Sequence, residues 1–189
     1  MKKLVRKESL FMESINSIKS AKKYIYIIIL LFFLSAIFGF IFADKLSFIN
    51  QILKELVDKT EGLGPFDLTV FIFLNNLQSA FLGMVLGLAF GIMPFVNSIG
   101  NGIVLGFVFE KVYNVSGFSN FWRILPHGIF ELPAIFIALG LGLQLGVNVI
   151  FNSRSLFYEL RRAVLAFLLI VLPLLIIAAI IEGLLISFS

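Results

Sequence analysis

The chain has 189 residues, of which 60% are hydrophobic and 14% are charged, and its mean hydropathy is +1.05. Soluble domains carry roughly 45–50% apolar and about 25% charged residues, so this composition excludes a soluble enzyme, a disordered linker and a nucleic-acid-binding module. There is no cysteine and one histidine, and the net charge is +4. Disulfides, thiolate metal sites and histidine-rich metal cages are therefore excluded, and no cofactor is expected.

Five apolar segments follow one another along the chain. A helix of about 20 apolar residues crosses the hydrocarbon core of a bilayer. The third segment is shorter and is interrupted by asparagine and glycine, so we expect a short or broken helix there. The sequence predicts an all-α, polytopic transmembrane bundle that forms a single domain over residues 24–189. The predicted spans are residues 24–43, 68–93, 95–109, 128–151 and 163–188.

Two segments beside the spans are amphipathic. Residues 1–23 combine seven basic residues with apolar residues at helical spacing, which predicts a helix on the anionic cytoplasmic surface of the membrane. Residues 44–67 follow the first span, and the apolar residues within 48–57 predict an interfacial helix on the outer side. For both segments the simpler interpretation is an amphipathic lead-in that only anchors the bundle.

The distribution of Lys and Arg predicts the orientation. The seven basic residues of 1–23 and three between the fourth and fifth spans, Arg154, Arg161 and Arg162, lie on one side of the predicted bundle. Cytoplasmic loops carry the excess of Lys and Arg. We therefore expect a multi-pass protein of the cell membrane with a cytoplasmic N-terminus and an extracytoplasmic C-terminus.

Small residues recur at four-residue spacing within the spans. Such stripes allow helix backbones to approach closely where lipid gives no hydrophobic drive for association. We interpret them as packing seams, either within one chain or between two copies, and a homodimer is the expected oligomer. The seams comprise Ser35, Gly39 and Ala43; Gly83, Gly87 and Gly91; Gly102 and Gly106; Gly142 and Gly146.

Amide side chains are also predicted at membrane depth. Asn75 and Asn76 lie in the second span and Asn101 in the third. An amide in an apolar environment loses free energy unless it is hydrogen-bonded. These residues are therefore expected to face the bundle interior, where they either join helices or contact a ligand.

The most unusual cluster is Pro126-His127-Gly128-Ile129-Phe130-Glu131-Leu132-Pro133. His127 and Glu131 are four residues apart and share one face of a helix. Glu131 is predicted about 7 Å below the outer end of its span, and Glu182 about 10 Å below the same side, at 1.5 Å per residue. Ionisable residues at this depth form a candidate functional site. A buried structural ion pair that joins the last two spans is the alternative.

The segment Pro126–Ala134 resembles the signature of the stage II sporulation protein M family of integral membrane proteins. Further matches are Asn101-Gly102-Ile103 with Gly106, the Gly140–Gly146 run, and Ala178–Glu182. The resemblance covers about Phe66 to Ser189. It implies the same five-span fold, and it implies that an activity shared by the family resides in Asn101, His127, Glu131 and Glu182. In endospore-forming bacteria, the member that gives the family its name looks like a membrane partner of cell-wall-degrading proteins during engulfment.

Two functions remain open from the sequence. The first is a channel or transporter in which His127, Glu131 and Glu182 line a polar path for an ion or small solute. The second is a non-catalytic scaffold that binds membrane or cell-envelope proteins. No phosphate-binding loop and no serine nucleophile with a base is present, so we do not expect an enzyme or a metal site.

Overall fold

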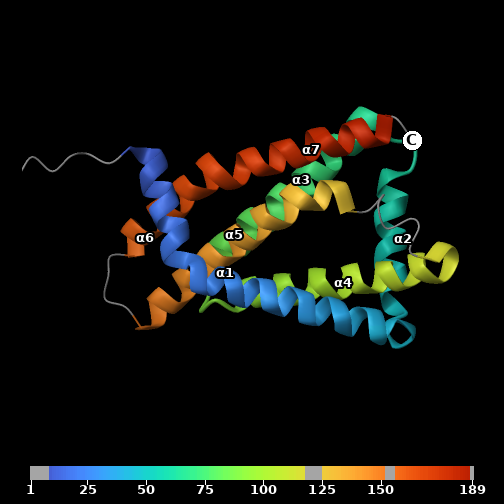
Figure 1. Cartoon of the computed structure of the whole chain (residues 1–189), viewed down its shortest axis with the longest axis horizontal. Coiled ribbons are helices and arrows are strands. Elements are labelled where there is room, and N and C mark those ends of the chain that lie inside the picture. Colours follow the sequence, from blue (N-terminus) through green and yellow to red (C-terminus); the bar gives the residue numbers. More distant parts are fainter. Residues whose placement is uncertain (1–8, 118–124, 152–155, 188–189) are drawn as a thin grey trace, which may run out of the picture.

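A computed structural model describes residues 9–117, 125–151 and 156–187, with all side chains in these ranges except those of residues 125–127. The described residues form helices joined by turns, and five of the helices are long and apolar enough to cross a membrane (Figure 1). The predicted all-α multi-span fold is confirmed. The spans are α1 (Leu10–Ile41), α3 (Pro65–Val85), α4 (Ile92–Ser116), α5 (Leu125–Phe151), and a fifth made of α6 (Leu156–Ala166), a π-helical turn (Phe167–Val171) and α7 (Leu172–Ser187).

α5 is the central helix. In its most apolar window 61% of the residues are buried, compared with 22–28% in the other four spans. α1 packs along α4 to form one pair, whereas α3 and α7 pack on α5 and on each other. Figure 1 shows that the α1–α4 pair and the α3–α5–α7 group meet at one end and diverge toward the end where α2 lies.

Both groups depend on close backbone contact at glycine. Between α1 and α4, Gly39 lies on the backbone of Ile103, and Gly106 lies on that of Ala36. In the 3-10 turn that follows α3 (Leu86–Leu88), Gly87 lies on the backbone of Gly142 of α5. The predicted seams thus face one another within a single chain, so they do not provide a surface for a second copy.

The third span differs from the expected short or broken helix. α4 is continuous from Ile92 to Ser116, and the break precedes it at Phe90 and Gly91, which both have positive φ angles of 57° and 74°. Pro94 lies in the first turn of α4, where the missing N–H of proline costs no hydrogen bond. Glycine suits this turn because its φ is +74° and because an added Cβ would lie 2.9 Å from Cδ1 of Leu143 on α5.

The first span is longer than the sequence predicts. α1 begins at Leu10, after Ser9 caps its N-terminus by accepting a hydrogen bond from the N–H of Met12. Ser14 and Ser17 are buried and Glu13 bonds Arg161 of α6 at 2.7 Å. The polar residues before residue 24 therefore extend the helix by packing on α6, which hydropathy alone does not reveal.

The fifth span contains a π-helical turn that proline explains. Pro173 has no N–H, and its ring crowds the carbonyl four residues earlier. The N–H of Leu172 bonds the carbonyl of Phe167, five residues back, rather than the usual fourth. The helix continues through this region with one wider turn, and the sequence analysis did not identify it.

The outer segment forms the expected amphipathic helix, α2 (Phe48–Thr60). Ile49 is buried against Ala43 and Phe107 of α4. Phe48 and Ile52, on the same helix, are 60% and 52% exposed. Figure 1 shows α2 running across the direction of the spans, which is the orientation of a helix lying in the membrane interface.

Candidate intramembrane carboxylate site

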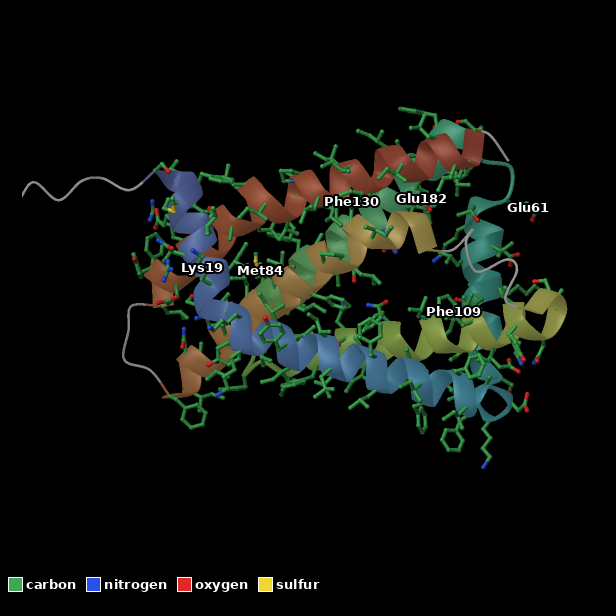
Figure 2. The ribbon with its side chains drawn as sticks, viewed as in Figure 1. Lys19, Glu61, Met84, Phe109, Phe130 and Glu182 are labelled. Atoms are coloured by element: carbon green, nitrogen blue, oxygen red, sulfur yellow. The ribbon has the colours of Figure 1, made fainter. Side chains whose placement is uncertain are left out.

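Glu131 and Glu182 lie on neighbouring spans, α5 and α7, which pack against each other. Both side chains are half-buried, and their charges are close enough to interact. Figure 2 shows Glu182 in the C-terminal part of α7 and Phe130, the residue before Glu131, in the N-terminal part of α5. The structure therefore places the two acids on packed helices, and that they share one site stays a prediction.

Small residues position the two carboxylates. On α5, Ala134, Ala138 and Gly142 continue the helical face of Glu131, and all are buried. On α7, Gly183 follows Glu182 and lies against Thr69 of α3, where an added Cβ would be 3.0 Å from the threonine hydroxyl. These residues keep the helices close, so both acids lie on helices that are packed against neighbouring spans.

Ionisation of both carboxylates is unfavourable without a counter-charge. Taking a carboxylate out of water costs several kcal/mol unless a counter-charge or hydrogen bonds offset the cost. Among the described side chains, neither Glu131 nor Glu182 has a hydrogen-bond or ion-pair partner. Two like charges in this environment favour binding of a cation or proton between them.

The third predicted member, His127, lies on α5 one helical turn before Glu131. Its side chain lies outside the described residues. The backbone places it at the outer end of the helix that carries Glu131, and its predicted role at the site stays a prediction.

Asn101 is engaged elsewhere. Its amide donates to Oδ1 of Asn97 on the same helix (2.8 Å), and the amide of Asn97 donates to the hydroxyl of Ser79 on α3 (2.9 Å). This chain of hydrogen bonds joins α3 to α4. The sequence analysis did not assign a role to Asn97 or Ser79, although the four-residue spacing of Asn97 and Asn101 indicates a shared face.

The two amides predicted on the second span also differ from each other. Asn76 is half-buried and shares a face of α3 with Ala80 and Gly83, which are buried toward α5. Asn75 is exposed. Of this pair, Asn76 is thus the residue directed toward the helix that carries Glu131.

Comparison with known proteins supports the relationship that the signature indicates. The family model described as Stage II sporulation protein M matches residues 28–185. The chain belongs to this family. The match begins well before Phe66 and includes all of the residues from Asn75 to Glu182 discussed above, so the family relationship covers almost the entire bundle.

A relative in Methanocaldococcus jannaschii is 33% identical over 128 residues, which cover 66% of this chain and 69% of the relative. That relative is described as an uncharacterized protein. Comparison with solved structures gives no match. The family therefore establishes an integral membrane protein of this kind, and the function has to be argued from the site.

The absence of cysteine from the natural chain permits a direct test of the predicted proximity. With Glu131→Cys and Glu182→Cys combined, a short bifunctional thiosulfonate reagent is expected to bridge most of the protein within minutes, because the two positions lie on packed helices. Mass spectrometry of the peptides measures the bridge. The matched pair Asn101→Cys with Glu182→Cys should remain unbridged. Equal bridging of the two pairs would contradict the described arrangement.

Proposed function

We propose that this protein transports a cation across the membrane and that Glu131 and Glu182 form its intramembrane binding site. The observation that supports this most is the pair of half-buried carboxylates on packed spans, with interacting charges and no described counter-charge. Acidic residues within spans are rare because they are costly, and they mark ion pathways and proton relays.

The physical requirement for transport is an intermediate affinity. The ion has to be bound tightly enough to enter the membrane and weakly enough to leave it. Two carboxylates on different helices meet this requirement, since small movements of α5 relative to α7 change the distance between the charges.

In this proposal His127 modulates the charge of the site, since it lies on α5 one helical turn before Glu131.

The proposal includes an orientation with a cytoplasmic N-terminus and an extracytoplasmic C-terminus, based on the placement of Lys and Arg. It also assigns the chain a non-catalytic role. A homodimer remains a prediction, and it requires a surface other than the glycine seams. In the proposed orientation the carboxylate pair lies in the outer half of the bilayer.

Flux through proteoliposomes tests the proposal. Vesicles that contain the purified protein are loaded in turn with protons, Na⁺, K⁺ or Mg²⁺, and efflux is followed with ion-selective dyes. We expect at least one cation to move, and Glu131→Gln or Glu182→Gln to lower its rate at least tenfold. Asp58→Asn, which removes an exposed carboxylate on α2, is the matched control and should retain the full rate. Absence of flux for all cations, or full flux in both glutamine variants, would refute the proposal.

A further inference from the structure

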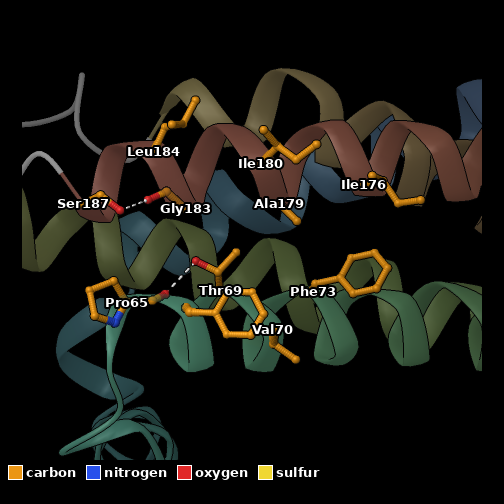
Figure 3. A pocket seen from close by; sticks show the side chains of 11 residues that line it. Pro65, Thr69, Val70, Phe73, Ile176, Ala179, Ile180, Gly183, Leu184 and Ser187 are labelled. Carbon is orange, nitrogen blue, oxygen red and sulfur yellow. Dashed lines mark hydrogen bonds between the residues drawn. The ribbon is translucent and has the colours of Figure 1, made fainter.

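α3 and α7 border two apolar cavities of about 600 Å³ and 530 Å³. The first lies in the outer half of the bundle, where Phe73 of α3 faces Ile176 and Ala179 of α7 (Figure 3). The second follows it along the same helix faces and is lined by residues that include Phe81 and Leu168. We call the two together the α3–α7 groove.

Small residues and the π-helical turn account for this groove. In the outer half the small residues Ala179 and Gly183 leave space between the helices. In the inner half Phe167 and Leu168 of the π-helical turn line the groove. π-bulges are frequent at functional sites because they displace the helix face without ending the helix. The wall residues are exposed, with Leu168 at 49% and Ile180 at 58%.

The lining of the groove is apolar except for the exposed side chain of Gln78 in its inner half and two hydroxyl groups at its other end. At its outer end the hydroxyl of Thr69 donates to the carbonyl of Pro65, and that of Ser187 donates to the carbonyl of Gly183, both at 2.8 Å (Figure 3). These hydroxyls are satisfied within their own helices. The occupant therefore has to be apolar over most of its length. Because lipid chains are as apolar as the groove, its specificity has to come from packing and from polar contacts at its ends.

A positive charge lies at the other end of the groove. Arg161 of α6 is three residues before Val164 and seven before Leu168, so it continues the side of the helix that lines the groove. Its side chain is 45% exposed. Two of its nitrogens bond Glu13 of α1, at 2.7 Å and 3.4 Å. A guanidinium has five N–H donors, so donors remain for a phosphate.

From this charge complementarity we propose that the α3–α7 groove binds an anionic phospholipid, with an acyl chain along the inner half of the groove and the phosphate on Arg161. Basic residues at the cytoplasmic ends of spans bind anionic headgroups, and arginine matches the geometry of phosphate. The distribution of Lys and Arg predicts that this end faces the cytoplasm, so the lipid belongs to the cytoplasmic leaflet. This inference does not depend on cation transport.

Photo-crosslinking of the full chain in phosphatidylcholine nanodiscs tests the groove. The probe is a trace of phosphatidylglycerol with a diazirine near the end of one acyl chain, and mass spectrometry locates the adducts. We expect adducts concentrated on the groove residues, including Leu77 and Phe81. Leu168→Trp, which fills the groove, should lower them at least fivefold, as should Leu77→Trp from the α3 wall. Leu169→Trp, at an adjacent exposed leucine outside the lining, is the matched control and should not change them.

The headgroup is tested by competition between lipids. The same experiment with a phosphatidylcholine probe gives the preference for the anionic headgroup, which Arg161→Gln should reduce to about one. Glu13→Gln breaks the same ion pair but keeps the guanidinium, so it should retain or increase the preference. The proposal is overturned if adducts are spread evenly around the spans, if Leu168→Trp and Leu169→Trp behave alike, if a second copy of the chain is crosslinked in the groove instead, or if Glu13→Gln abolishes the preference as Arg161→Gln does.

Discussion

Replacing Gly106 with leucine is expected to lower the free energy of unfolding by several kcal/mol and to leave little folded protein. A side chain at this position would collide with the backbone of Ala36 and Phe40 on α1. Backbone atoms cannot rotate away as a flexible side chain can, so α1 and α4 would have to separate. Overpacking of a close-packed interior typically costs about 1–3 kcal/mol and sometimes more. Loss of the entire α1–α4 contact places this variant at the upper end.

Gly100 provides the matched control on the same helix. A Cβ there meets nothing within 4 Å, and the residue is exposed. Gly100→Leu should therefore retain or gain stability, by up to about 1 kcal/mol from helix propensity. Thermal unfolding in detergent, together with the monodisperse fraction after purification, measures both variants. Similar losses for the two would show that the described contact between α1 and α4 is wrong.

The second large effect is expected at the carboxylate pair, where neutralising either acid should stabilise the protein. In cation-free buffer, Glu131→Gln and Glu182→Gln are each expected to increase the free energy of unfolding by about 1–3 kcal/mol, because they remove a charge that has no counter-charge among the described side chains. A saturating cation should instead stabilise the natural protein, by about 2.7 kcal/mol at one hundred times its dissociation constant. The variants should lose this dependence.

This measurement distinguishes a binding site from a structural lock. If Glu131 and Glu182 held α5 to α7, neutralising either would lower stability and the cation would have little effect. Asp58→Asn, on the exposed surface of α2, should change neither the stability nor its dependence on the cation. Unfolding transitions over a range of cation concentrations provide both quantities in one experiment.

The number of spans was predictable from the sequence because the lipid solvent imposes it. A hydrocarbon core about 30 Å thick requires long apolar helices, and hydropathy measures that requirement directly. The ends of the helices were less predictable, since a polar residue near a helix end lies either at the membrane surface or in a contact with another helix. Ser14 and Ser17 of α1 are buried against protein, whereas hydropathy assigns such residues to the membrane surface.

The same ambiguity explains the third span. Its asparagines and glycines lower the hydropathy of α4 and predict a break. In the structure Asn97 and Asn101 satisfy each other and Ser79, and Gly106 allows contact with α1. Partners on other helices compensate for the local polarity, and one sequence does not identify those partners.

Depth counting places Glu131 and Glu182 toward the same end of neighbouring spans, and the packing of α5 on α7 is compatible with this, but that the two acids form one site stays a prediction. It was insufficient for Asn101, since a residue at similar depth can face a different neighbour. The order of the helices around α5 decides which neighbour a residue faces, and this order cannot be predicted from composition and periodicity. The π-helical turn at Phe167–Val171 was likewise missed, although Pro173 was the available signal.

The most direct measurement of the central proposal is an experimental density map of the protein with a bound cation that scatters anomalously or can be replaced by one that does. We expect a peak between the carboxylates of Glu131 and Glu182, at about 2.3–2.6 Å from their oxygens if the ion resembles calcium, and no peak in Glu131→Gln. Two carboxylates sealed in dry packing with no ion or water between them, or directed toward different neighbours, would contradict the proposed site.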